Sequence, residues 1–565
     1  MFGNKNTQKT GLNINKIRKD FPILGRKIYG RPLVYLDNGA TTQKPKIVID
    51  TVNEIHCSQN SNVHRGVHYL SEQMTGRHEE AREKIRQYLN AESVKEIIFT
   101  AGTSASLNLA AACFGQTYIK EGDEIIISEM EHHSNLVPWQ FLRDRRGAKL
   151  KVIPFNDKGE LLLDEYKKLF SERTKIVAVV HTSNSLGTIN PVKEMAAIAH
   201  SHNVPILIDG TQAVQHGKID VQEIDCDFYA FSGHKIYGPT GIGVLYAKKR
   251  WLEEMCPYQG GGDMIDSVTI EKTVYAELPN KFEAGTPNYI GAIGLGVALD
   301  YLQKTGLEKI AAYEQELLAY ATAKLSAISG LKIYGNAADK ACIISFLLDN
   351  THFYDVGVYL DRMGIATRTG MHCTHPLWAH FKTEGSVRAS FSFYNTFAEI
   401  DLLAEKIKEI KNIFAAKRPG ARKKNSGNPE EAQKKIVASF KPFNTWTERY
   451  AYLVGLGKNL PPLKPELETE KTLIHGCQVS TWYYSTLEDG KIYFHIDSSS
   501  FMIKGYIVLL LEIFSGRTPE EIANIKLDFF ARIGMAADYT KLRANSLWKL
   551  VELMRADAAA YKNNN

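Results

Sequence analysis

Residues 368–376 read RTGMHCTHP and place Cys373 between His372 and His375 in a polar stretch. Three potential ligands within four positions, with no further ligand at a suitable spacing, make a metal site the weakest interpretation. A buried thiol is a better one, since free cysteines are usually buried. The stretch contains a glycine and a proline, which indicates an exposed loop. Arg368 and the two histidines favour the thiolate, so a nucleophile is the leading interpretation and a buried thiol stays open.

A second group of residues has the types that hold a phosphorylated cofactor. The stretch DFYAFSGHKIYGPTGIGVLY places Lys235 before a glycine-rich turn, although a lysine in a loop is by itself unremarkable. Upstream, TAGTSAS turns from a strand into a helix, where backbone N–H groups with Thr103 and Ser104 can hold a phosphate. Asp209 ends the apolar run VPILID and, taken alone, is equally consistent with a helix cap. Together they supply what pyridoxal phosphate (PLP) requires: an anchor, a partner for the pyridine nitrogen and a Schiff-base amine.

The surrounding pattern predicts the elements that position these residues. From about Val34 to Leu245, short β-branched runs alternate with helical stretches, as in EIIFT before TSASLNLAAACF and DEIIIS before NLVPWQFLRD. This is the βαβ pattern of a wound, mostly parallel sheet covered by helices, in which ligands lie at the carboxyl ends of the strands. Beyond Gly291, a helical stretch, two strand-like runs and a final amphipathic helix ending near Phe414 indicate a smaller α+β domain.

Composition sets limits on partners and location. At 565 residues the chain is too long for one core of usual size, so we expect at least two domains. Its 69 Lys+Arg against 63 Asp+Glu are nearly balanced, and we expect no nucleic-acid or membrane partner. The first twenty residues lack an apolar core of signal-peptide length. Seven scattered cysteines form no C-x-x-C pair and no zinc spacing, so we expect reduced thiols, no metal and a cytoplasmic protein.

The end of the chain reads as a separate unit. Residues 415–435 lose all large apolar side chains and predict a flexible linker. Residues 436–565 regain helical and strand periodicity, enough for an independent domain. There, LIHGCQVSTWYY places Cys477 just before a strand-like run, where a packed core cysteine is one interpretation.

A set of longer motifs follows in order along the first part of the chain: YLDNGATTQKP, NVHRGVHYLS, EMEHHSNLVPWQ, DGTQAVQH, SGHKIYGPTGIGVLY, FEAGTPN and RASFSFYNT. Over roughly residues 20–414 the chain thereby resembles PLP fold type I enzymes of the class V aminotransferase group, and more closely the SufS-type cysteine desulfurases. The resemblance implies an α/β, aspartate aminotransferase-like fold. Its large wound-sheet domain would span about 34–290, with a small α+β domain formed by the N-terminal segment plus about 291–414.

The resemblance also implies the central catalytic roles. Lys235 would form the Schiff base with PLP, Asp209 would pair with the pyridinium, and His132 would stack on the cofactor ring and serve in proton transfer. Cys373 would be the nucleophile that takes sulfur from L-cysteine as a persulfide while L-alanine leaves. Met371 stands where the family often has a second histidine, a departure that leaves the nucleophile in place.

Further residues would contact the cofactor and the substrate. By this resemblance, Gln212 would contact the phenolate oxygen of PLP. Its phosphate would be held by Thr103, Ser104, Ser232 and His234. Thr286 would reach the cofactor across the interface of a homodimer. Arg388 would clamp the substrate carboxylate, because a planar bidentate donor fixes the orientation of an amino acid. Asn184, beside both cofactor and substrate, and His64 would line the pocket.

The tail resembles the SufE family of sulfur acceptors. The match begins near Pro429 and includes WTERYAYLVGLGKNLP, the turn around Cys477 and HIDSSSFMIKG. It implies a separate α+β domain in which Cys477 takes the persulfide sulfur from Cys373 by thiol exchange. Iron–sulfur scaffold proteins would be the final acceptors.

Other functions fit parts of the sequence. A selenocysteine lyase or another PLP-dependent β-lyase keeps Lys235 but does not need Cys373 as a sulfur carrier, and the domain that holds Cys477 argues against it. The tail also fits a docking module in which Cys477 is buried and inert. An inactive interaction protein is disfavoured, since the whole set of catalytic residues is retained.

Overall fold

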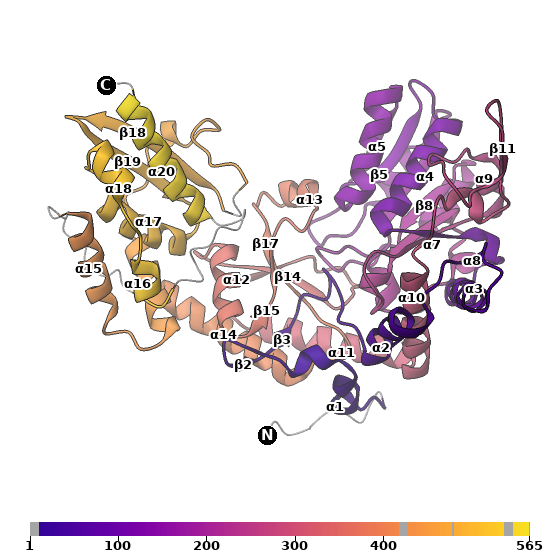
Figure 1. The fold of residues 1–565 in the computed structure, drawn as a ribbon, viewed down its shortest axis with the longest axis horizontal. Coiled ribbons are helices and arrows are strands. Elements are labelled where there is room, and N and C mark those ends of the chain that lie inside the picture. The colour runs from indigo at the N-terminus through magenta and orange to yellow at the C-terminus, as the bar shows by residue number, and fades with distance from the viewer. Residues whose placement is uncertain (1–10, 417–427, 477–478, 536–545, 564–565) are drawn as a thin grey trace. The chain divides into compact units, whose positions relative to one another are not determined.

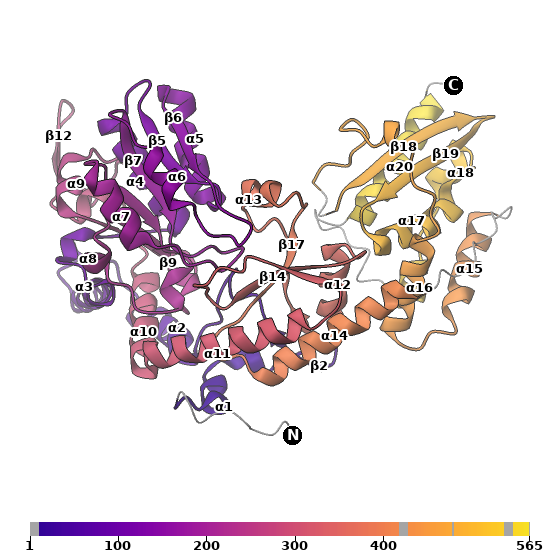
Figure 2. The same cartoon turned by 180° about the vertical axis from the view of Figure 1, so that it is seen from behind.

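The computed structural model describes residues 11–416, 428–476, 479–535 and 546–563. In this part of the chain two compact units form. The first holds the chain up to residue 329 with residues 333–346 and 364–402, and the second holds residues 330–332, 347–363 and the described residues from 403 onward. Figures 1 and 2 label the helices and strands from opposite sides.

A seven-stranded sheet is the centre of the first unit, in the order β4-β10-β9-β8-β7-β5-β6. Strands β9, β8, β7, β5 and β6 are parallel, and β10 runs antiparallel to β4 and β9. The bounds are β4 Ile97–Thr100, β5 Glu124–Ser128, β6 Lys149–Ile153, β7 Thr174–Val180, β8 Ile206–Asp209, β9 Phe228–Ser232 and β10 Gly243–Ala247. The predicted wound, mostly parallel sheet is confirmed.

Helices cover this sheet and bury its strands. The strands therefore carry apolar side chains on both faces. Helices α4 and α5 pack against each other, and Leu107 and Trp139 of these helices share one core with Ile125, Ile176 and Leu207 of the strands. Helices of the first unit include α2 Lys46–Glu54, α3 Tyr69–Leu89, α4 Thr103–Tyr118, α5 His133–Arg146, α7 Val192–Ser201, α10 Tyr289–Thr305 and α11 Leu307–Ser326. The expected helices after the first strands are therefore present.

The strand directions bring polar residues to one edge of the sheet. Since β10 is antiparallel to both β4 and β9, those two strands point the same way as β8. Their carboxyl ends, Thr100, Ser232 and Asp209, consequently lie at the same edge. This is the edge at which wound sheets bind their ligands.

A smaller sheet in the order β13-β14-β17-β16 supplies further residues. Its register places Arg388 opposite Arg368, while Asp37, just beyond β3, bridges to Ser390. Strand β3 also pairs in parallel with β15. The bounds are β3 Val34–Tyr35, β13 Leu331–Tyr334, β14 Ile343–Leu348, β15 Ile365–Ala366, β16 Arg368–Gly370 and β17 Ser386–Ser390. Short pairings between distant segments thus bring one carboxylate beside two guanidinium groups.

The second unit combines the tail with two elements that precede it, α12 and the end of α14. A two-stranded antiparallel hairpin, β18–β19, is its only sheet among the described residues. The bounds are α12 Phe353–Arg362, α14 Phe397–Ala415, α15 Pro429–Phe440, α16 Trp446–Gly457, β18 Thr481–Glu488, β19 Lys491–Ser498, α17 Phe501–Phe514, α18 Pro519–Asn524, α19 Phe529–Arg532 and α20 Ser546–Asn563.

Helices α16 and α17 cross closely because glycines stand at the crossing. A Cβ atom on Gly457 would overlap the Phe501 carbonyl oxygen, and one on Gly505 would overlap the Leu453 carbonyl oxygen. The N-terminus of α17 is capped by Asp355 of α12, whose Oδ2 accepts from the Phe501 N–H across 2.9 Å. Burial raises the pKa of Asp355 to about 6.

The first helix of the tail begins inside the segment that composition predicted to be a linker. Residues 429–435, which we expected to belong to the linker, form the first turns of α15. Asn428 caps that helix, a proline follows at the first position, and two glutamates complete the first turn, all of which favour a helix start. Residues 417–427 of the expected linker lie outside the described part. Among the described helices, none has the length and apolar character needed to cross a membrane.

Candidate active site

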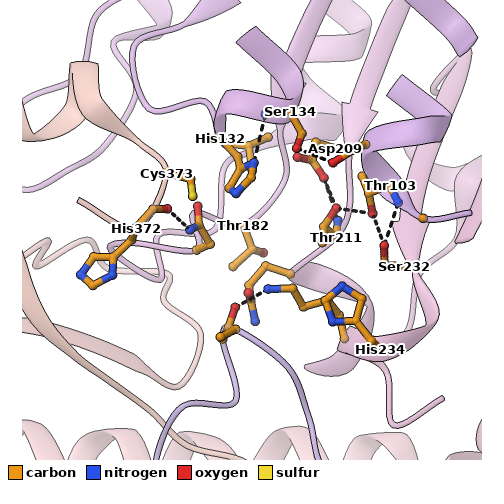
Figure 3. A pocket seen from close by; sticks show the side chains of 18 of the residues that line it. Thr103, His132, Ser134, Thr182, Asp209, Thr211, Ser232, His234, His372 and Cys373 are labelled. Atoms are coloured by element: carbon orange, nitrogen blue, oxygen red, sulfur yellow. Dashed lines mark hydrogen bonds between the residues drawn. The ribbon is translucent and has the colours of Figure 1, made fainter. Parts of the chain in front are cut away.

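A cavity of about 870 Å³ opens at the carboxyl edge of the large sheet. Figure 3 shows side chains that surround it. Most of the site residues expected from the sequence line this one cavity: Thr103, Ser104, His132, Asn184, Asp209, Gln212, Ser232, His234, Lys235, Cys373 and Arg388.

Lys235 follows β9 in a short 3₁₀ turn, Gly233–Lys235, and its Nζ donates a hydrogen bond to the Gly39 carbonyl oxygen. Burial, reinforced by the positive charge of Arg388, lowers the pKa of Lys235 to about 7. Much of the amine is therefore neutral near neutral pH. A neutral amine is the form that attacks an aldehyde.

Asp209 ends β8 and is almost completely buried. It accepts hydrogen bonds from the Thr211 backbone N–H across 3.0 Å and from the Thr211 hydroxyl. Burial raises the pKa of Asp209, because the carboxylate loses water. A cation placed against this carboxylate, such as a protonated pyridine nitrogen, would restore its ionised form.

The N-terminus of α4 is open toward a ligand. Gly102 precedes the helix with φ +150° and provides no side-chain cap, so the backbone N–H groups that follow Thr103 in the first turn have room for an anion. The Ser232 Oγ accepts from the Thr103 backbone N–H across 2.7 Å, and the Thr103 and Thr211 hydroxyls lie 2.8 Å apart. Ser104 Oγ contacts Ser134 Oγ at 2.6 Å. This hydroxyl-rich helix end fits a phosphate.

Two other side chains have an atom left for a ligand. Gln212 Oε1 is buried without a partner among the described residues, and an amide turned over offers N–H instead. His132 Nδ1 accepts from the Ser134 backbone N–H across 3.0 Å, so in the neutral ring Nε2 carries the proton. Burial, with Lys235 nearby, lowers the pKa of His132 to about 4. The ring is therefore neutral at physiological pH.

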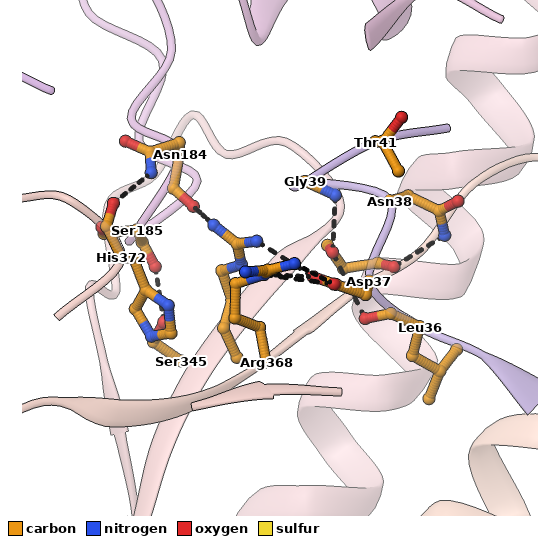
Figure 4. A network of polar contacts seen from close by, with 12 residues as sticks. Leu36, Asp37, Asn38, Gly39, Thr41, Asn184, Ser185, Ser345, Arg368 and His372 are labelled. Carbon is orange, nitrogen blue, oxygen red and sulfur yellow. Dashed lines mark hydrogen bonds and ion pairs between the residues drawn. The ribbon is translucent and has the colours of Figure 1, made fainter. Parts of the chain in front are cut away.

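Arg388 is fully buried, and both terminal nitrogens of its guanidinium group have partners. Figure 4 labels Asp37, Arg368 and Asn184 of this polar network. One terminal nitrogen donates to the Asn184 carbonyl oxygen across 2.9 Å, and the other lies 3.2 Å from Asp37 Oδ1. Arg368 pairs with the second oxygen of Asp37 at 2.8 Å. Arg388 Nε has no partner among the described residues. The arrangement leaves positive charge in the cavity, which suits a substrate carboxylate.

Cys373 lies on an exposed loop between β16 and a short helix, α13 (His375–His380). His372 and Cys373 both have positive φ, +51° and +59°, which is uncommon for these residue types. The Asn184 amide donates to the His372 carbonyl oxygen across 2.8 Å, and the His133 backbone N–H donates to the Cys373 carbonyl oxygen across 2.9 Å. These bonds keep the thiol at the cavity. Arg368 and Arg388 both interact electrostatically with Cys373.

His372 cannot supply the positive charge that the sequence suggested. Its side chain is buried, its Nε2 lies 2.9 Å from Ser386 Oγ, and burial lowers its pKa well below the usual range. The histidine is therefore neutral. Of the groups proposed to favour the thiolate, Arg368 remains charged.

Some expected residues lie elsewhere. His64 is not among the residues that line the cavity; its Nε2 lies 3.1 Å from Glu79. His64, Glu79 and His78 have three potential metal-ligand atoms close together, but Arg82 hydrogen bonds with both of the latter two. Thr286 lines a smaller cavity of about 260 Å³ that shares three lining residues with the main one, namely Ala101, Ala105 and Gly241. Cys477 lies outside the described residues.

Two residues without a predicted role, Asp37 and Thr211, contact residues of the site. Asp37 stands inside the motif YLDNGATTQKP, and Thr211 follows Asp209 by two positions. A short polar residue just after a strand end was the available signal for Thr211. Asp37 also follows a strand end, but its pairing with Arg368 and Arg388 had no local signal, because these partners are 331 and 351 positions away.

The fold and the cavity together define a class of enzyme. A seven-stranded mixed sheet, a buried lysine after one strand, a buried carboxylate at the end of the next, and an open helix N-terminus are the arrangement of PLP fold type I. The residues present fit PLP, since the unpartnered Gln212 Oε1 and the uncapped α4 match its phenolate and phosphate ends.

Comparison with known proteins agrees. Residues 34–403 match the model of the family Aminotransferase class-V, and residues 434–558 match that of the Fe-S metabolism associated domain, SufE. A cysteine desulfurase of Synechococcus elongatus is 51% identical over 400 residues, which cover 71% of this chain and 64% of that protein. A cysteine desulfurase of Escherichia coli is 48% identical over 403 residues, covering 71% of this chain and 99% of that protein.

A solved structure is similar over the same part. The crystal structure of the cysteine desulfurase CsdA from Escherichia coli has a TM-score of 0.67 at 36% identity, covering 71% of this chain and 99% of that chain. The chain belongs to the cysteine desulfurase family of class V aminotransferases, a PLP-using fold, and it carries a SufE domain in its tail.

Proposed function

We propose that this chain removes sulfur from L-cysteine, releases L-alanine and holds the sulfur as a persulfide on Cys373, from which Cys477 takes it. The observation that carries the proposal is that Cys373, Lys235 and Arg388 line one cavity. An amine for the cofactor, a cation for the substrate carboxylate and a thiol nucleophile are the three groups that this reaction needs. A transaminase needs only the first two.

Each pocket residue has a defined task in the first half of the reaction. PLP, when bound, supplies an electron sink for the bonds at the substrate Cα. Asp209 would hold the protonated pyridine nitrogen, and the N-terminus of α4 with Ser232 would hold the phosphate. Lys235, with its pKa near 7, can bind the cofactor and accept the Cα proton. Arg388 would hold the substrate carboxylate.

The sulfur step balances without an external oxidant. The Cys373 thiolate forms a bond to the substrate sulfur while the Cβ–S bond breaks and its electron pair stays on carbon. The carbon is thereby reduced and the sulfur oxidised to the persulfide level. The proton released by the substrate thiol completes the methyl group of alanine, and Lys235 returns its proton to Cα, while the neutral His132 ring can donate a hydrogen bond from Nε2 beside these atoms. The Cys477 thiolate then attacks the outer sulfur, and Cys373 leaves as a thiolate.

A homodimer is part of the proposal. Val67, Tyr69 and Leu70, at the start of α3, are exposed apolar side chains. Ile270 and Val268, in the hairpin of β11 (Ile265–Val268) and β12 (Thr273–Tyr275), are exposed as well. Clustered exposed apolar side chains mark interfaces. Sedimentation of Val67→Asp/Tyr69→Ser would show monomer against a wild-type dimer, and a wild-type monomer would contradict this part.

The proposed location is the cytoplasm, and the proposed final acceptors are iron–sulfur scaffold proteins. All six cysteines in the described ranges are unpaired, which suits a reducing compartment. Reconstitution of a cluster on a purified scaffold protein, with L-cysteine as the sulfur source, tests the destination. Release of the sulfur as free sulfide, with no cluster formed on the scaffold protein, would contradict the proposed destination.

A single-turnover assay tests the reaction itself. The holoenzyme is mixed with L-cysteine, and alanine and sulfide are measured without added reductant. We expect Cys373→Ser to lose alanine formation by about two orders of magnitude or more, and Cys477→Ser to form one equivalent of alanine normally. Pyruvate and sulfide in place of alanine would instead indicate a β-eliminating lyase, and alanine formed by Cys373→Ser at the wild-type rate would indicate a lyase that does not use Cys373 as its sulfur carrier, with the tail as a docking module.

A further inference from the structure

Two histidines meet next to the Cys373 loop. His375 Nδ1 lies 2.7 Å from His133 Nε2, and the His375 backbone N–H donates to the same Nε2 across 3.3 Å. The His133 backbone N–H in turn donates to the Cys373 carbonyl oxygen across 2.9 Å. The first turn of α5 is therefore joined both to Cys373 and to the first turn of α13 that follows it, and all of these residues belong to the first unit.

The hydrogen bonds fix the protons of this pair. A backbone N–H can only donate, so His133 Nε2 must be an acceptor. His133 is therefore neutral with its proton on Nδ1, and His375 Nδ1 carries a proton that it donates to His133. A proton added to His133 Nε2 would face two donors at once. The bond from the His375 backbone N–H can form only while His133 is neutral, and the ring contact with His375 Nδ1 as donor requires the same.

We propose that His133 and His375 are positioning residues that hold the Cys373 loop at the cavity through a contact that protonation of His133 breaks. The proposal rests on the proposed role of Cys373 as the sulfur carrier. Two further contacts hold the loop without a titratable side-chain group: the Asn184 amide donates to the His372 carbonyl oxygen, and the Ser185 and Thr374 hydroxyls lie 2.7 Å apart. The histidine pair is thus the pH-dependent part of the attachment.

The surroundings of His133 favour its neutral form. Burial and the neighbouring His375 lower the pKa of His133. The other titratable groups that face it are His132 on its own helix, with ring centroids 6.2 Å apart, and Cys373 on the loop. Glu129 pairs with His380 at the far end of α13. Since the pKa is lowered, the contact is intact above the ordinary histidine pKa of about 6.5 and is lost progressively as pH falls below it.

Hydrogen exchange of the full-length holoenzyme tests the contact directly. At about pH 7.5, His375→Ala should raise exchange of the backbone amides in the peptide around 371–376 by about five- to tenfold, because the ring contact is lost and the neighbouring bond from the backbone N–H of residue 375 to His133 Nε2 is left without its support. His133→Gln should keep most of the protection, since its side-chain oxygen accepts where Nε2 did. His380→Gln, in the same short helix but bonded only to Glu129, is the matched control and should leave exchange of that peptide unchanged.

The pH profile separates positioning from a merely structural role. After correction for intrinsic exchange, the wild type should keep the protection of this peptide down to about pH 6.5 and lose it as pH falls further, while His133→Gln should not lose it. His375→Ala should also lower the rate of alanine formation severalfold with KM for L-cysteine unchanged. Unchanged exchange in His375→Ala, or the same acid loss of protection in His133→Gln, would overturn the proposal. Because exchange is measured without substrate, it reports on the histidine contact even if Cys373 carries no sulfur.

Discussion

Asp37 Oδ1 lies 3.2 Å from a terminal nitrogen of Arg388, whose side chain is buried from solvent. The same carboxylate binds Arg368 through its other oxygen at 2.8 Å. One carboxylate therefore orients both cations that face the thiol loop. The substrate-binding role proposed for Arg388 depends on this orientation.

Asp37→Asn should weaken substrate binding more than turnover. The amide keeps the shape of the side chain but loses the charge that holds two arginines in place, so we expect KM for L-cysteine to rise about tenfold, equivalent to one lost charge-assisted hydrogen bond. Steady-state kinetics of alanine formation measure this. Asp50→Asn, which removes an exposed partner of Lys46, is the control. An unchanged KM in Asp37→Asn would mean that Arg388 needs no such support.

Cofactor uptake should depend on pH through Lys235. The amine has its pKa lowered to about 7, and only the neutral amine reacts with the PLP aldehyde. The rate of uptake by apoprotein should therefore rise as pH increases through about 7 and level off above it. Absorbance of the bound cofactor follows the reaction. A midpoint above pH 9 would show that the pocket does not lower this pKa.

The fold and much of the cavity could be predicted from the sequence for a physical reason. Buried strands read as β-branched runs, and the polar residues that follow them must meet at one edge of a wound sheet, which located Thr103, Asp209 and Lys235. Patterns within a short stretch of sequence do not predict contacts between segments that are far apart in the chain. The pairing of His133 with His375 spans 242 positions and has no local signal.

The start of the tail illustrates a different limit. Composition alone predicted a linker up to residue 435, because the segment has no large apolar side chain before Ile436. The helix-start signals at Asn428 and Pro429 were present and were outweighed by that composition. Capping residues such as Asn428 predict the start of a short helix better than composition does when few of its residues are apolar.

The second unit should lose stability as pH rises through the acid range because of Asp355. Its pKa is raised to about 6, against about 4 when unfolded, so its contribution is fully present below about pH 4 and is lost as pH rises through 6. The loss is on the order of 2 kcal/mol. Urea-dependent hydrogen exchange of α17 peptides at a series of pH values measures it. Asp355→Asn should flatten the profile, and Asp528→Asn, at an exposed position, should not.

Gly505→Ala should disrupt the crossing of α16 and α17. The added methyl group overlaps the Leu453 carbonyl oxygen, so we expect a loss of about 1–3 kcal/mol in the free energy of unfolding of the second unit. The matched control is Gly76→Ala in α3, where a Cβ meets nothing within 4 Å and should stabilise its helix by about 0.5–1 kcal/mol. Equal effects of the two substitutions, read by urea unfolding, would rule out close packing as the reason for Gly505.

The most direct measurement of the central claim is mass spectrometry of the cysteine peptides after the holoenzyme meets L-cysteine and is alkylated. The proposed relay predicts one additional sulfur on the peptide with Cys373 and on the peptide with Cys477, and loss of the Cys477 signal in Cys373→Ser. Alanine formed with no sulfur on either peptide would contradict the account, because the enzyme would then release sulfur without carrying it.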